Sequence, residues 1–117
     1  MSIDFNVSRR PDQDSITFEM AEKGTSLAQA ILDASDIDHI IAILSKARMS
    51  LEDEVPRDLE PQSRLEAVFD PVWKCPAKHS GEGKVLAVRH PGLGWLAFDF
   101  PEDQATEVGQ WLSGARP

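Results

Sequence analysis

The sequence predicts an α+β fold in which two ββα units form one mostly antiparallel sheet, with two helices packed on one face. The main observation is a pseudo-repeat, because residues 16–47 and 84–115 match in apolar spacing at an offset of 68 positions. Each copy reads strand, glycine turn, strand, helix. One such unit cannot bury its own apolar face, whereas two side by side can share a core, so the repeat favours a single shared sheet.

The length of 117 residues fits one domain, which can bury roughly 65% of its unfolded surface without disulfides or metals. We therefore expect a single domain over 1–117, with one ββα unit at 16–48 and the other at 84–114. The connector at 50–83 holds four of the eight prolines and an acidic excess. A short helical turn is expected within it, near 63–67.

Alternation of apolar and polar residues predicts the strands. It is present at 3–7 and again at 16–20. Residues 26–33 fit a strand or a helix equally well by pattern. The repeat favours a strand, because the counterpart of this segment, 94–100, alternates more clearly. A short extended piece is also expected at 72–74.

A helix is expected at the end of each unit. The first begins near Ser35, which can cap it, and the second begins near Pro101, a residue type favoured at the first helical position. The first helix carries an apolar stripe at helical spacing, which predicts a face turned to the core. The stripe consists of Ile37, Ile40, Ile41 and Leu44.

Composition excludes several classes of protein. The chain has 12 basic and 20 acidic side chains and a net charge of −8, which argues against nucleic-acid binding. Its apolar stretches are too short to span a membrane, and its N-terminus lacks the features of a secretory signal. A single cysteine excludes an internal disulfide and fits a reducing compartment. We therefore expect a cytoplasmic protein that binds neither membranes nor nucleic acid.

The sheet face turned away from the helices is the candidate interaction face. A face exposed to water is expected to carry Thr, Lys and Glu, but this one carries apolar and small side chains. Three occupants could cover it: the connector, a second copy of the chain in a homodimer, or another protein or ligand. The connector would act through Val68, Phe69, Val72 and Trp73. The interaction face consists of Trp95, Leu27, Ile31, Ala97 and Val85, with Ala87 beside them.

One cluster combines reactive side-chain types, namely Cys75, His79 and His90, with Arg89 beside it. A Cys-x3-His spacing can direct two ligands to one metal ion, but structural zinc sites need four ligands and usually more cysteines. The sequence also lacks a base and an orienting acid at the spacing of a known catalytic triad. We therefore expect no metal and no cofactor.

These patterns favour a small acidic protein-interaction module without enzymatic activity. It would associate with itself or with another protein, and its net charge favours a basic partner. The alternative is a small enzyme, or a ligand- or metal-binding protein, that uses the cleft of Cys75, His79, His90 and Arg89.

Overall fold

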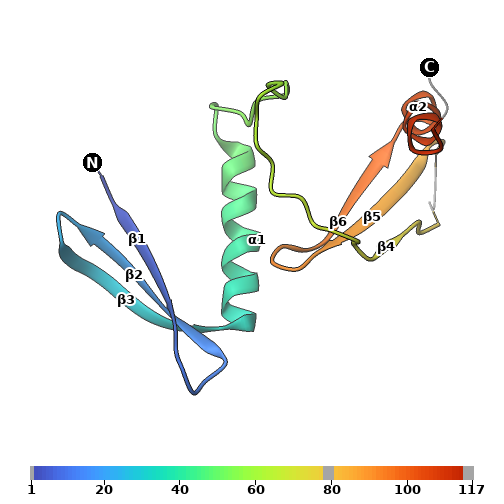
Figure 1. Ribbon diagram of the computed structural model, residues 1–117. Helices are drawn as coiled ribbons and strands as arrows, with labels where there is room; N and C mark the ends of the chain where they lie inside the picture. The colour runs from blue at the N-terminus through green and yellow to red at the C-terminus, as the bar shows by residue number, and fades with distance from the viewer. Residues whose placement is uncertain (1, 78–80, 115–117) are drawn as a thin grey trace. The chain divides into compact units, whose positions relative to one another are not determined.

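The computed structural model describes residues 2–77 and 81–114 of the chain. The chain forms two compact units, Met1–Leu59 and Glu60–Pro117, and in each unit three strands are followed by a helix (Figure 1). The fold is therefore α+β. The elements are, in chain order, β1 (Asp4–Arg9), β2 (Ser15–Glu22), β3 (Thr25–Asp33), α1 (Ala34–Ser50), β4 (Trp73–Lys74), β5 (Lys84–His90), β6 (Gly94–Phe100) and α2 (Glu102–Leu112).

The first unit contains an antiparallel sheet with the strand order β1-β2-β3. The chain turns from β2 to β3 at Lys23 and Gly24, which both adopt positive φ angles, of 50° and 81°. Two successive residues with positive φ produce the twist that suits a two-residue hairpin. The segment whose pattern fits either a strand or a helix lies in β3.

The second unit contains an antiparallel sheet with the order β4-β5-β6. Gly83 precedes β5 with a φ of 104°, and a Cβ atom there would collide with the carbonyl oxygen of Phe100. This position therefore needs glycine, because the backbones approach too closely for a side chain. The extended piece expected at 72–74 is present as β4.

The expectation of a single shared sheet is not confirmed. The strands form two separate three-stranded sheets, one in each unit. Each unit also begins with a strand that precedes its ββα segment, β1 in one case and β4 in the other. The helical turn expected near 63–67 is absent from that described segment, which has no regular secondary structure.

The helix α1 begins one residue after Asp33, and Asp33 rather than Ser35 is its N-cap. The Asp33 carboxylate accepts a hydrogen bond of 2.9 Å from the backbone N–H of Asp36. The Asp36 carboxylate in turn accepts one of 3.1 Å from the backbone N–H of Asp33. This reciprocal arrangement is a capping box, in which an aspartate replaces the usual Glu or Gln at the third helical position.

Burial is the most unusual property of the two units. Among the described residues, only Ala21 is buried, with 6% of its surface exposed. The central strand of the second sheet is an example. Val85 and Leu86 point to opposite faces of β5, and both are only half-buried. None of the residues of α1 is buried either, and Leu44, expected in the core, is 61% exposed. The apolar surfaces that the sequence assigns to a core are thus largely open.

Candidate functional site

The register of the second sheet defines its two faces. Arg89 pairs with Trp95, and Ala87 pairs with both Ala97 and Lys74, so these residues share one face, called here the Trp95 face. The opposite face is called the Phe98 face. The Trp95 face consists of Lys74, Val85, Ala87, Arg89, Trp95, Ala97 and Asp99, and the Phe98 face includes Trp73, Leu86, Val88, Leu96 and Phe98.

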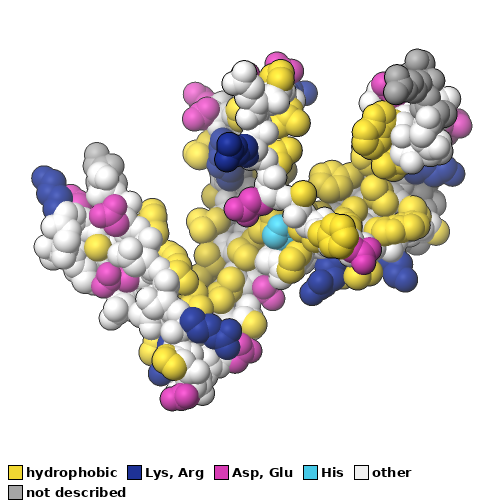
Figure 2. All heavy atoms as spheres, viewed as in Figure 1, with side chains coloured by type: hydrophobic (Ala, Val, Ile, Leu, Met, Phe, Trp, Pro, Cys, Tyr) yellow, Lys and Arg dark blue, Asp and Glu magenta, His cyan; other side chains and the backbone are white. Residues whose placement is uncertain are grey.

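Both faces are open to solvent. Trp95 is 51% exposed on one side of the sheet and Phe98 is 54% exposed on the other. Figure 2 shows hydrophobic side chains gathered at the surface over the strands of this unit. The helix α2 therefore leaves Phe98 exposed. Apolar patches of this kind mark interaction surfaces in soluble proteins.

The candidate interaction face is divided between the two units. Trp95, Ala97 and Val85 lie in the β4–β6 sheet, whereas Leu27 and Ile31 lie in β3 of the first unit. Leu27 sits at an irregularity between β2 and β3, and both β3 side chains are exposed. The structure therefore gives each unit its own exposed apolar surface.

The connector reaches the Trp95 face with one of the residues expected to cover it, since Val72 lies opposite Arg89, but Val72 is itself 52% exposed and the two aromatic residues lie elsewhere. Phe69 is 96% exposed and contacts almost nothing. Trp73 pairs with Val88, so it lies on the opposite, Phe98 face. The reason is that side chains alternate along a strand, which places Trp73 and Lys74 on different sides of the sheet.

Two edge strands form a second kind of exposed surface. Native sheets protect their edges with short strands or charged residues. The edge strand β4 has only two residues, and β1 carries Asp4 and Arg9. By contrast, β3 has no charged residue before Asp33, and β6 has only Asp99. The charge-free runs are visible in the sequence, but only the strand order shows that they lie at edges.

The cleft proposed around Cys75 is dispersed over the sheet. Lys74 pairs with Ala87, so the next residue, Cys75, comes opposite Leu86 if the register continues. Leu86 is four residues from His90, which corresponds to about 13 Å along β5. Cys75 and His90 lie too far apart to share a metal ion or to react together. Arg89 and His90 are neighbours in β5, so they point to opposite faces. His79 falls outside the described residues.

His90 has a structural role at its own position. Its Nδ1 atom accepts hydrogen bonds of 3.0 Å from the backbone N–H groups of both Gly92 and Leu93. The imidazole therefore stabilises the turn that joins β5 to β6. Cys75 is exposed and borders a surface hollow of about 500 Å³ together with Lys84 and Val85.

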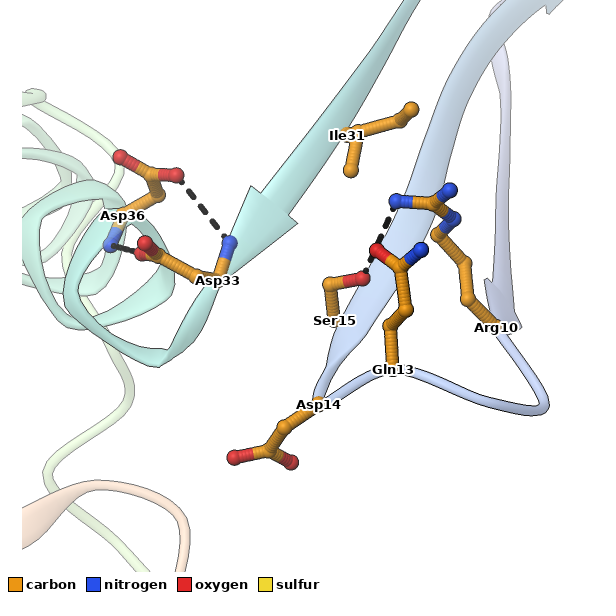
Figure 3. Close-up of a pocket in the computed structure, with 7 residues that line it drawn as sticks. All are labelled: Arg10, Gln13, Asp14, Ser15, Ile31, Asp33 and Asp36. Atoms are coloured by element: carbon orange, nitrogen blue, oxygen red, sulfur yellow. Dashed lines mark hydrogen bonds between the residues drawn. The ribbon is translucent and has the colours of Figure 1, made fainter.

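A second hollow, of about 310 Å³, lies in the first unit beside the start of α1 (Figure 3). Its charged side chains already have structural partners. Asp33 and Asp36 form the capping box, and Arg10 donates a hydrogen bond of 3.4 Å to the hydroxyl of Ser15. These side chains stabilise the start of a helix and a turn.

The described residues include no group of three or more His, Cys, Asp or Glu side chains placed to hold a metal ion. Among the same residues, the helices are too short or too polar to cross a membrane. No protein-family model, curated protein or solved structure matches the chain, so the two sheets and their open surfaces are the observations from which its function is inferred.

Proposed function

We propose that this chain is a non-enzymatic protein-interaction module that buries the Trp95 face and the neighbouring apolar surfaces against another polypeptide. The observation that carries the proposal is the near absence of buried residues in the described chain. Hydrophobic burial is the dominant favourable contribution to folding, and the units as they stand obtain little of it.

The exposed area gives the size of the deficit. The accessible surface is 10651 Å², whereas a folded monomer of 13.0 kDa exposes about 6300 Å². Two independent folded bodies of half that mass would together expose about 7700 Å². The chain thus exposes about 3000 Å² more than even two separate domains, an amount within the range of obligate interfaces.

Charge supports a role in association as well. Residues 1–59 hold twelve acidic and six basic side chains, a net charge of −6, whereas residues 60–117 hold eight and six, a net charge of −2. An acidic surface accelerates encounter with basic proteins, so a heterologous partner would be basic. The second unit has a smaller net charge and therefore tolerates a partner with either a positive or a negative net charge.

The alternative, a reactive cleft of Cys75, His79, His90 and Arg89, has weaker support. Its described members are separated along and across the sheet, and His90 already binds the backbone of its own turn. A catalytic site needs such groups within hydrogen-bonding distance of a common point.

The test compares two substitutions in the second unit. Trp95→Asp places a charge on the proposed surface and should weaken association, with itself or with a captured partner, by at least about 30-fold, as expected for an aromatic hot spot. Phe69→Asp changes a side chain that contacts almost nothing and should leave association unchanged. Association is measured by sedimentation equilibrium and by pull-down with the full chain. Equal behaviour of wild type and both variants would contradict the proposal.

A further inference from the structure

We infer that the partner of the second unit is another copy of this chain, joined by antiparallel pairing of β6 with β6 of the second copy and centred on Ala97. The inference rests on the proposed function and names the occupant of one exposed surface of the second unit, the open edge of β6, which borders the Trp95 face. The resulting sheet would have six strands, in the order β4-β5-β6-β6-β5-β4, and a two-fold axis through its centre.

The backbone of β6 is oriented for this pairing. The Arg89 N–H donates a hydrogen bond of 2.8 Å to the Val72 carbonyl, so the backbone groups of Arg89 point toward β4 and away from β6. Its partner Trp95 is therefore in a non-hydrogen-bonded pair, and the Trp95 N–H and C=O point away from β5. The direction of the backbone N–H and C=O groups reverses from each residue of a strand to the next. Ala97 stands two residues after Trp95, so its backbone groups also point to the open edge of β6. Two copies of Ala97 can then exchange hydrogen bonds across the axis.

The same register matches apolar side chains on the Phe98 face. A two-fold axis at Ala97 sets Leu96 opposite Phe98 of the second copy. Within each chain Leu96 already pairs with Val88, and Phe98 pairs with Leu86. An uninterrupted apolar row would therefore cross four strands, and it would cover part of Phe98, which is 54% exposed in the single chain. Cross-strand pairs of this kind stabilise sheets.

On the Trp95 face the register joins opposite charges. Trp95 lies opposite Asp99 of the second copy, and Arg89 pairs with Trp95 from the other side. The Arg89 side chain is long enough to extend over the indole ring toward that carboxylate. The two-fold axis forms this arrangement twice, so the surface is complementary to itself in charge.

The net charges of the two units also favour β6 over β3 as the strand that self-associates. The β3 edge is equally unprotected, but it belongs to the unit with a net charge of −6, and pairing two such units brings these charges together. The β6 edge belongs to the unit with a net charge of −2, in which basic residues lie on β4 and β5.

Disulfide trapping tests the register directly. In a Cys75→Ser background, Ala97→Cys places two thiols in a hydrogen-bonded pair with a Cα separation of about 5.5 Å, within the range that a disulfide spans. Mild oxidation of the full chain should yield mainly a covalent dimer. The matched control is Thr106→Cys, an exposed site in α2, which should remain mostly monomeric on a denaturing gel. Equal trapping at both sites would overturn the inference.

Proline at the same position tests the edge without a charge change. Ala97→Pro removes a backbone N–H that β5 does not use, so the sheet within the unit should persist. It deletes one donor from each copy and should raise the dimer dissociation constant by at least about 30-fold. Ala97→Thr keeps the N–H and serves as the control that stays dimeric. A proline variant that dimerises as tightly as wild type, with its sheet intact by circular dichroism, contradicts the inference.

The mass of the wild-type species in solution, together with the exposure of its tryptophans, separates failure of this inference from failure of the proposed function. A monomer whose tryptophans are readily quenched by acrylamide, and which binds a different protein, overturns the β6 pairing and retains the interaction module. A monomer whose tryptophans are shielded and whose amides exchange slowly overturns both, because such a chain has buried its apolar surface alone.

Discussion

Asp33 and Ser35 both have side chains suited to cap a helix, and they stand two positions apart at the junction of β3 and α1. The structure assigns the cap to Asp33, because only there does the extended backbone of the strand direct the carboxylate to the N–H of Asp36. Ser35 already lies inside the first turn. Sequence alone identified a cap in this region but misplaced it by two residues, since the choice depends on where the strand ends.

Asp33→Ala should lower the free energy of unfolding of the first unit by about 1 kcal/mol, because the N–H of Asp36 loses its acceptor. Ser35→Ala should change it by a few tenths of a kcal/mol in either direction, as expected for a site inside the helix. Urea unfolding followed by circular dichroism at 222 nm measures both. A larger loss for Ser35→Ala than for Asp33→Ala would show that the cap lies where the sequence pattern placed it.

At the scale of elements, the sequence predicts most of the strands and both helices. Alternation locates β1, β2 and β6, and the repeat resolves the ambiguous segment as β3. What the pattern cannot supply is the surface that each apolar face contacts. The stripe on α1 has the spacing of a core face, yet its members are at most half-buried in the chain. Periodicity shows which side of an element avoids water, and it leaves open whether the same chain or another one covers it.

This distinction predicts different results for two exposed apolar residues of α1. Leu44 lies on the stripe and is 61% exposed, whereas Met49 lies at the end of the helix and is 83% exposed. If an associated chain covers the stripe, Leu44→Lys should destabilise the assembled protein by about 2 kcal/mol, the value of one buried leucine. Met49→Lys should have an effect within about 0.5 kcal/mol. Thermal unfolding of the full chain at fixed concentration compares them, and identical midpoints would show that the stripe stays exposed.

At the scale of the whole molecule, the proposed function implies that folding and association are coupled. Each unit has its own sheet and helix, but with Ala21 as the buried residue the described chain lacks a core of ordinary size. The candidate site could be anticipated from the sequence only as a list of apolar residues, because the division of Leu27 and Trp95 between two sheets depends on strand pairing.

Coupling of this kind makes stability depend on protein concentration. Because the proposed associated state would bury the apolar surface, mass action should raise the unfolding midpoint when the concentration rises from about 1 to about 100 µM. A rise of several degrees is expected for a chain of this length. Differential scanning calorimetry at both concentrations measures it, with reversibility checked by rescanning. A midpoint independent of concentration would mean that one chain completes its own fold.

The long edge strands β3 and β6 have a further consequence for the newly made protein. An edge with a single charged residue is weakly protected against the addition of further strands, so an unassembled copy is open to fibril growth as well as to correct assembly. The acidic excess opposes this outcome, because copies that each carry a charge of −8 repel one another in solution. That protection vanishes near pH 4.7, where the net charge approaches zero. The acidity of the first unit would thus limit aggregation of edge strands that, under the proposed function, must remain available for pairing.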